Sequence, residues 1–283
     1  MEKIQQALER ARQERSVALA GAGMGQDRAY QARTPGKHDV STPSSELDMV
    51  ATVSASPQAL RRHRIVAAQS AGLGRKAARA AEAFRMLRAQ ILSRLDAIGG
   101  RSLAVTSPQE RDGKSIVALN LAITIAKHHE RGAVLIDADL RRPSLHSYLG
   151  IRPPHDIADH LEGQVTLDAC LLRPGMESLA VLLQSKPLRR SSELLASSRM
   201  QTLMGEVKRR FPTSIIVVDC PPLLATEDPL VIQQHVDGCL LVLREGMTSK
   251  TDLRRAAELV GEERYLGTVL NQAKWQQLPG YYY

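Results

Sequence analysis

Aromatic residues are scarce in this chain, and half of its tyrosines stand at one end. Of 283 residues only 3% are aromatic, with one Trp, two Phe and six Tyr. Tyr281, Tyr282 and Tyr283 are the last three residues, a position where side chains usually bury little surface. Packing is therefore a poor explanation for this cluster, and docking in a groove or a chance tail are the simplest alternatives.

Cysteine is scarce as well, and long apolar runs are missing. Cys170, Cys220 and Cys239 stand singly, which disfavours a disulfide framework or a zinc site. The eight histidines show no metal-ligand spacing. No apolar run reaches the roughly 18 residues of a transmembrane helix, and residues 1–15 are too charged for a secretory signal. We therefore expect a cytoplasmic protein.

Acidic residues are few in the stretch that carries most of the positive charge. The formal net charge is +8, and residues 61–101 hold ten Lys and Arg against Glu82 and Asp96. Such an excess suits an anionic membrane leaflet, nucleic acid or the acidic face of another subunit, and a solvated helix face explains it equally well. The stretch lacks a series of interleaved aromatic residues for base stacking, so no nucleic acid partner is expected.

Composition and periodicity divide the chain into three parts. Residues 2–14 have a helical pattern, residues 16–70 are rich in Gly, Ser, Thr, Pro and Gln with little periodicity, and a helical pattern begins at Arg75. We predict an N-terminal helix with a flexible linker over residues 1–74, a folded domain over 75–276, and a tyrosine-rich tail over 277–283.

Short apolar runs alternate with helical stretches beyond Gly100. The runs cover residues 103–106, 133–136, 179–183, 214–218, 239–243 and 266–270. This alternation predicts an α/β fold with a mostly parallel, doubly wound sheet covered on both faces. Ligands of such sheets bind at the carboxyl ends of the strands, so the residues after each run are the candidates for function.

The first of these strand ends carries Gly113-Lys114-Ser115 at the start of a helix. Backbone N–H groups, the helix amino terminus and a lysine can all converge there on a phosphate chain, and the Ser115 hydroxyl can bind Mg²⁺. The full phosphate-loop pattern has Gly where this chain has Pro108, so the motif alone is moderately specific. Its position predicts a nucleotide-binding loop made of Asp112, Gly113, Lys114, Ser115 and Ile116.

Acidic residues follow two further strands. Asp137 and Asp139 lie in VLIDADLRRP, and Asp219 lies in SIIVVDCPP. A single aspartate at a strand end is more often a helix cap or loop residue. Three carboxylates at one rim would repel one another, whereas Mg²⁺ and a lysine beside nucleotide phosphates neutralise them. The combination predicts a nucleotide hydrolase or phosphotransferase.

With these motifs the sequence resembles the bacterial tyrosine kinases of polysaccharide export. This family is a branch of the deviant Walker A P-loop NTPases, which also include the MinD and ParA positioning ATPases. The GKS triplet matches the end of Walker A, VLIDADLRRP matches Walker A′, and IIVVDCPP matches Walker B. SSELLASS resembles the family's Asn-Pro-x-Glu-Leu-Leu segment without Asn-Pro, and Asn271 stands where the family has an adenine-contacting Asn.

The resemblance implies an ATP-dependent protein tyrosine autokinase that regulates exopolysaccharide or capsular polysaccharide synthesis and export, with Mg²⁺ as cofactor. It implies that Lys114 holds the β- and γ-phosphates and that Ser115, Asp139 and Asp219 hold the metal. Asp137 would orient or deprotonate the attacking tyrosine, and a purely metal-organising role is the alternative.

EAFRMLRAQI matches the family's Glu-x-x-Arg-x-x-Arg helix through Glu82, Arg85 and Arg88. These residues span about 120° of one helix side. Glu82 and Arg85 could form an ordinary surface pair, whereas contact between copies would be head-to-tail and close into a ring. The resemblance favours the ring, in which Tyr281, Tyr282 and Tyr283 are phosphorylated between subunits.

The segment EKIQQALERARQER resembles the start of kinases from exosortase (XrtA) loci. This weaker likeness implies a separately encoded membrane chain-length determinant protein as activator. The kinase would then be peripheral at the inner face of the plasma membrane, held there through its partner.

The phosphate loop departs from the family at Arg111, which occupies a Gly position. A left-handed backbone there would cost about 1–2 kcal/mol, although arginine could also add a phosphate contact. A degenerate kinase acting as a scaffold is one alternative that rests on this departure. The other is a MinD/ParA-like positioning ATPase without kinase activity, but those proteins have a second lysine early in the loop, and residues 108–112 contain none.

Overall fold

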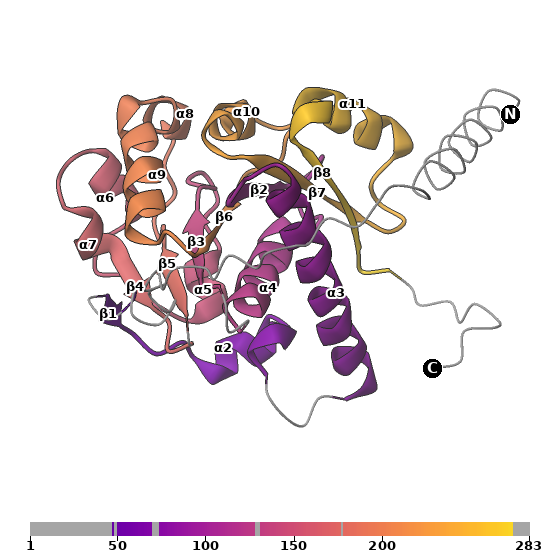
Figure 1. Ribbon diagram of the computed structural model, residues 1–283, viewed down its shortest axis with the longest axis horizontal. Helices are drawn as coiled ribbons and strands as arrows, with labels where there is room; N and C mark the ends of the chain where they lie inside the picture. The colour runs from indigo at the N-terminus through magenta and orange to yellow at the C-terminus, as the bar shows by residue number, and fades with distance from the viewer. Residues whose placement is uncertain (1–46, 48–49, 70–73, 128–130, 177, 274–283) are drawn as a thin grey trace, which may run out of the picture. The chain divides into compact units, whose positions relative to one another are not determined.

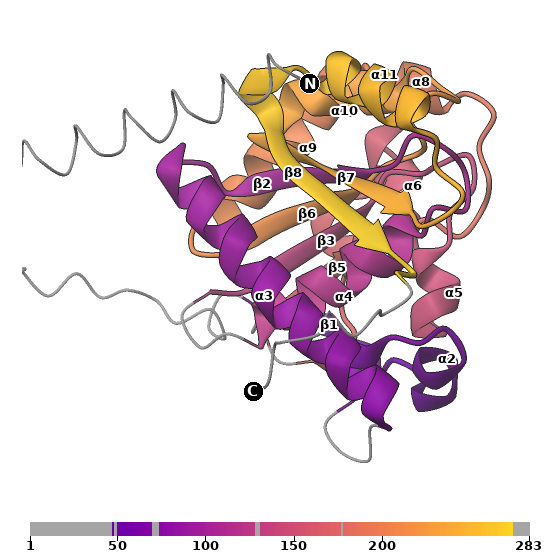
Figure 2. The same ribbon diagram turned by 90° about the vertical axis from the view of Figure 1, so that its right-hand side faces the viewer.

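The computed structural model describes residues 47, 50–69, 74–127, 131–176 and 178–273. These residues form an eight-stranded sheet in the order β1-β4-β5-β3-β6-β2-β7-β8 (Figures 1 and 2). Only the β4–β5 pairing is antiparallel among the described strands. The mostly parallel α/β sheet predicted from the sequence is therefore confirmed. The strands are β1 Ala51–Thr52, β2 Ser102–Thr106, β3 Ala133–Asp137, β4 Leu171–Arg173, β5 Leu179–Leu182, β6 Ile215–Asp219, β7 Gly238–Arg244 and β8 Tyr265–Asn271.

Helices cover both faces of the sheet. One face is packed by α3 (Arg75–Ala97), α4 (Lys114–Ala126) and α5 (Leu145–Leu149). The other face is covered by α6 (Ile157–Leu161), α7 (Leu167–Cys170), α8 (Ser191–Leu195), α9 (Ser198–Arg210), α10 (Asp228–Ile232) and α11 (Lys250–Val260). Among the described helices none is both long and apolar enough to cross a bilayer.

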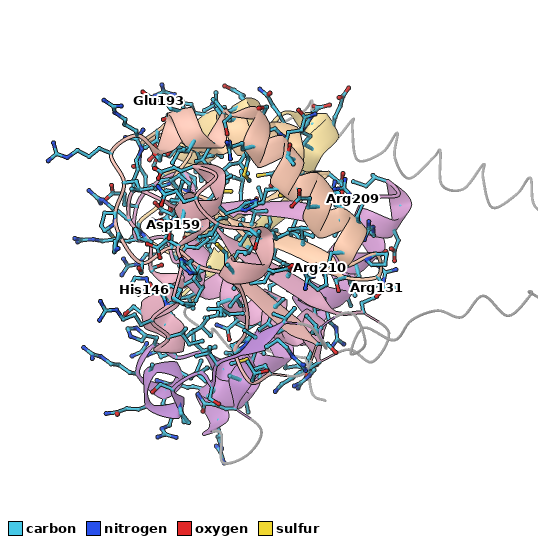
Figure 3. The ribbon with its side chains drawn as sticks, turned by 90° about the vertical axis from the view of Figure 1, so that its left-hand side faces the viewer. Arg131, His146, Asp159, Glu193, Arg209 and Arg210 are labelled. Atoms are coloured by element: carbon cyan, nitrogen blue, oxygen red, sulfur yellow. The ribbon has the colours of Figure 1, made fainter. Side chains whose placement is uncertain are left out.

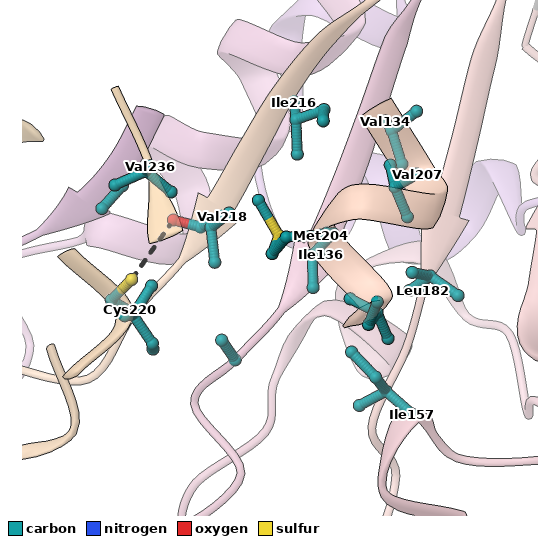
Figure 4. Packing of buried hydrophobic residues seen from close by; sticks show 14 of the residues in the cluster. Val134, Ile136, Ile157, Leu182, Met204, Val207, Ile216, Val218, Cys220 and Val236 are labelled. Atoms are coloured by element: carbon teal, nitrogen blue, oxygen red, sulfur yellow. Dashed lines mark hydrogen bonds between the residues drawn. The ribbon is translucent and has the colours of Figure 1, made fainter. Parts of the chain in front are cut away.

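Strand residues alternate between the two covered faces. Val134 and Ile136 of β3 pack with Met204 and Val207 of α9, as Figure 4 shows, while Leu135 belongs to the cluster on the opposite face. Because both faces are covered, the central strands β2, β3, β5 and β6 are buried at every position instead of at every second one. This burial explains why the sequence shows continuous apolar runs.

Residues 50–69 fold onto the sheet, although the sequence analysis placed them in the linker. β1 pairs with β4 at the edge of the sheet, α2 covers Pro57–Arg62, and η2 covers Val66–Ala68. Ile65 is fully buried, and the Ala67 N–H donates to Asn120 Oδ1 at 2.9 Å. These elements are too short to show a period in the sequence, so only the capping Ser56 and the following Pro57 could have revealed α2.

The sheet has an amino edge, where the parallel strands begin, and a carboxyl edge, where they end, and different side chains lie at each. Figure 3 shows Arg131, Arg209 and Arg210 near the edge where the strands begin, and His146 and Glu193 at the other side. The second edge is where β2, β3 and β6 end, and it is the edge at which parallel sheets bind ligands.

Candidate active site

The predicted acidic residues and the lysine meet at the carboxyl edge of the sheet. Asp137 and Asp219 are direct partners at the ends of the neighbouring strands β3 and β6. Lys114 begins α4, and its Nζ lies 2.7 Å from Asp139 Oδ2. The structure thus brings together Lys114 and the three aspartates that the sequence analysis placed at the strand ends, Asp137, Asp139 and Asp219.

A cavity of about 500 Å³ opens beside this cluster. Its wall includes Lys114 and Ser115 from the phosphate loop, Asp139 and Arg141 from the loop after β3, and Pro221 after β6. Three strand ends therefore supply one cleft, as the doubly wound architecture predicts.

The carboxylates of Asp137 and Asp219 are buried and poorly satisfied. Both residues are 0% exposed, and both oxygens of Asp219 and Oδ1 of Asp137 lack a hydrogen-bond partner within the described residues. Burial raises the pKa of Asp219 to about 6 against the opposing charge of Lys114. Burial, followed by the charges of Asp219 and Asp139, raises the pKa of Asp137 well above its usual range. Buried carboxylate oxygens without donors are suited to a cation and its bound water.

The donor set fits Mg²⁺ held jointly with phosphate. The described residues contain no group of three or more His, Cys, Asp or Glu side chains that could hold a metal by themselves. Mg²⁺ usually binds one or two protein ligands and takes its other ligands from water and substrate phosphates. Ser115, which is 4% exposed, and the unpartnered Asp219 are placed for that arrangement.

Lys114 keeps its charge in this environment. Burial acts to lower the pKa of its ammonium, but the carboxylates of Asp219 and Asp139 outweigh burial and raise it. The Lys114 Nζ also lies 3.4 Å from Ser115 Oγ. The lysine is therefore a permanent cation at the amino terminus of α4, where an anionic ligand is favoured.

Contacts from β8 and the loop after β7 set the shape of the phosphate loop. Gly113 has φ 92°, and a Cβ on it would clash with Asn271 Nδ2. The Asn271 amide donates to the Asp112 carbonyl at 2.9 Å. The Asp112 carboxylate accepts from the Gln109 N–H and from Thr248 Oγ1, both at 3.1 Å, and burial raises its pKa. Asn271 and Asp112 thus lie at the loop, with Asp112 directed into the protein.

Two arginines of the Walker A′ motif were missed by the sequence analysis. Arg141 Nε donates to the buried Asp228 at 3.0 Å, and its Nη2 donates to Ser192 Oγ at 2.8 Å. Arg142 forms an ion pair with Glu110 of the phosphate loop. The two adjacent arginines in VLIDADLRRP could have been noticed in the sequence. Their partners are remote in sequence, and no local pattern marks them.

The predicted oligomerisation residues lie on α3, outside the cleft lining. Arg85 pairs with Glu82 of the same helix, and the two side chains are 53% and 57% exposed. Arg88 Nη1 donates to the Thr124 carbonyl of α4 at 3.2 Å. Ile116, in the first turn of α4, is half-buried against the core. The three tail tyrosines lie outside the described residues.

The chain is similar in sequence to several proteins named tyrosine-protein kinases. No family model matches it. It is 28% identical over 204 residues to "Putative tyrosine-protein kinase CapB" of Staphylococcus aureus, covering 71% of this chain and 88% of CapB. It is 29% identical over 174 residues to "Tyrosine-protein kinase ptk" of Acinetobacter johnsonii, covering 62% of this chain but only 23% of that protein.

The solved structure of a bacterial tyrosine kinase domain is also similar to this chain. The kinase domain of the Escherichia coli tyrosine kinase ETK superposes with a TM-score of 0.67 at 25% identity, covering 82% of this chain and 92% of that domain. The cell division ATPase MinD of Pyrococcus furiosus superposes at 0.53 and 22% identity over 60% of this chain and 71% of MinD. At 22% identity, this second likeness shows the fold alone.

Proposed function

This chain belongs to the bacterial tyrosine kinases, and on that premise we propose that it is an ATP- and Mg²⁺-dependent tyrosine autokinase. Its acceptors would be Tyr281, Tyr282 and Tyr283. Its activity would regulate exopolysaccharide or capsular polysaccharide synthesis and export. The observation that carries this proposal is the contact of Lys114 with Asp139 beside the unpartnered carboxylate of Asp219, in a cleft bounded by the phosphate loop.

Phosphoryl transfer depends on positioning and charge neutralisation more than on covalent chemistry. Lys114 would exchange Asp139 for the β- and γ-phosphates while the loop amides hold the same phosphates. Ser115, Asp139 and Asp219 would hold Mg²⁺, directly or through water. When bound, Mg²⁺ neutralises charge on the transferring phosphoryl group.

Asp137 is the proposed partner of the attacking tyrosine. Its Oδ2 accepts from the Leu145 N–H at 3.3 Å, which leaves Oδ1 open. Positive charge close to a carboxyl group favours the ionised form, so arrival of the metal would convert Asp137 to a carboxylate. Since tyrosine has a reference pKa near 10, that carboxylate would orient the hydroxyl and accept its proton late in the reaction.

The proposed assembly is a ring of copies joined through Glu82, Arg85 and Arg88. The intrahelical pair of Glu82 and Arg85 is exposed and therefore weak, so exchange for a partner across an interface is inexpensive. The tail of one subunit would enter the cleft of the next, and each phosphate would add about −1.5 to −2 charges. Their repulsion near the acidic cluster would loosen the ring. A membrane chain-length determinant protein would activate the kinase at the inner face of the membrane.

A single assay separates this function from its alternatives. The parent chain, Lys114→Met and a triple Phe variant of Tyr281, Tyr282 and Tyr283 are incubated with γ-labelled ATP and Mg²⁺. We expect phosphotyrosine in the parent and its loss in both variants. ATP turnover without phosphotyrosine would indicate a positioning ATPase, and neither activity would indicate a scaffold. Undiminished phosphotyrosine in the triple variant would refute the role of the tail.

A further inference from the structure

Four cationic side chains line the cleft, and three of them are already paired. Lys114 binds Asp139, Arg141 binds Asp228, and Arg142 binds Glu110. The fourth is Arg111, whose side chain is exposed to the cleft and has no ion pair or hydrogen bond within the described part of the chain. Arg111 is therefore the lining cation that can bind an anion without giving up a carboxylate.

The backbone at Arg111 is held in an unusual conformation. Its φ is 65°, in the left-handed region that non-glycine residues seldom occupy. The adjacent Asp112 carboxylate is held by the Gln109 N–H and by Thr248, which keeps the loop in this shape. A left-handed arginine at the mouth of a ligand cleft is a deviation of the kind that clusters at functional sites.

The two sides of the phosphate loop have different neighbours. Asn271 and Thr248 contact it from the side of β7 and β8 and do not line the cavity. Arg111 lies on the cavity side, which it lines together with Arg142 and with Asp139, the carboxylate that contacts Lys114. A polyphosphate seated on Lys114 would direct its reacting end toward that side, since the carboxylates act on that end.

We propose that Arg111 binds the terminal phosphate of ATP and makes the cleft prefer ATP to ADP. This inference rests on the proposed function, because it requires a nucleotide at the phosphate loop. Arginine suits the role because its guanidinium stays charged and can donate two parallel hydrogen bonds to phosphate oxygens. The left-handed backbone would then serve to place the Arg111 side chain at that phosphate.

Nucleotide affinity tests the proposal without phosphoryl transfer. Binding of a non-hydrolysable ATP analogue and of ADP, each with Mg²⁺, is measured by calorimetry for the full-length parent, Arg111→Gly and Arg111→Lys. We expect Arg111→Gly to weaken binding of the ATP analogue about tenfold, the effect of losing one charge-assisted hydrogen bond. ADP binding should change less than about twofold. Arg111→Lys should recover part of the difference because it keeps the charge.

Arg142→Ala is the matched comparison, because Arg142 lines the same cavity but is neutralised by Glu110. It should change the ratio of ATP to ADP affinity less than Arg111→Gly does. Equal effects of the two variants, an unchanged ratio in Arg111→Gly, or equal weakening of both nucleotides would overturn the proposal.

The Arg111→Gly variant should also unfold at the same temperature as the parent or a higher one, since glycine accepts φ 65° without strain. A lower midpoint would make Arg111 a structural residue and refute the inference. A parent that binds neither nucleotide would remove the proposed function itself. A parent that binds both, with a variant that behaves identically, would remove only the role of Arg111.

Discussion

Asp219 and Asp237 stand at opposite edges of the sheet and differ in what their carboxylates touch. Asp237 precedes β7 and accepts from the Arg101 N–H at 2.8 Å, the Ser102 N–H at 2.9 Å and Ser102 Oγ at 2.7 Å. Asp219 ends β6 and has no hydrogen-bond partner for either oxygen within the described residues. The chain thus supplies hydrogen bonds to the carboxylate at the amino edge and none to the carboxylate at the carboxyl edge within the described residues.

The pKa shifts of the two acids follow from this difference. Burial acts to raise the pKa of Asp237, but its hydrogen bonds and Lys208 outweigh burial and lower it. Burial raises the pKa of Asp219 to about 6, and the charge of Lys114 and the nearby Ser115 hydroxyl only partly oppose the rise. The Asp237 carboxylate therefore stabilises the folded protein, whereas burial of the Asp219 carboxylate destabilises it.

Replacing the unsatisfied acid should have the largest effect on function. Asp219→Asn is expected to lower the rate of phosphotyrosine formation at least about a hundredfold, because it removes charge aimed at the metal and phosphates. The free energy of unfolding at pH 7 should not fall, and should rise by on the order of 1 kcal/mol, since a buried charge that Lys114 only partly compensates is lost. Labelled ATP and urea unfolding measure the two quantities. An Asp219→Asn variant that is both active and less stable than the parent would contradict the difference between the two acids.

Replacing the satisfied acid should have the reverse effect. Asp237→Ala leaves the Arg101 and Ser102 amides without their acceptor and should lower the free energy of unfolding by about 1–3 kcal/mol. Phosphotyrosine formation by the folded fraction should not change. Asp96→Ala is the control at the same edge, because its exposed pair with Arg131 should contribute no more than about 1 kcal/mol. Equal losses of unfolding free energy in the two variants would show that the hydrogen bonds of Asp237 stabilise the protein no more than an exposed ion pair does.

The sequence predicted the carboxyl edge better than its surroundings, for a physical reason. Lys114, Asp139 and Asp219 follow three apolar runs, and the ends of parallel strands meet at one edge whatever the loops do. Residues 50–69 were assigned to the linker because β1, α2 and η2 are too short to show periodicity. The contact of Asn271 with the Asp112 carbonyl joins residues far apart in the chain, so no local pattern marks it. The ion pair between Arg141, which lines the cleft, and the buried Asp228 was missed for the same reason.

The smallest expected effect is in the pH dependence of stability, where the two acids should act with opposite sign. The pKa of Asp219 rises from 3.8 to about 6 on folding, so between these values the folded chain binds more protons than the unfolded chain. Its contribution to stability is complete below the unfolded pKa and is lost as pH rises through 6. The lowered pKa of Asp237 gives a contribution to stability that is present above its unfolded pKa and is lost as pH falls through its folded pKa.

The stability of Asp219→Asn relative to the parent should therefore grow from pH 4 to pH 7, by on the order of 1 kcal/mol. For Asp237→Ala the deficit relative to the parent should shrink as pH falls below about 4. Urea unfolding at several pH values measures both differences, and two curves with the same slope would show that the edges do not differ in the way their hydrogen bonds indicate.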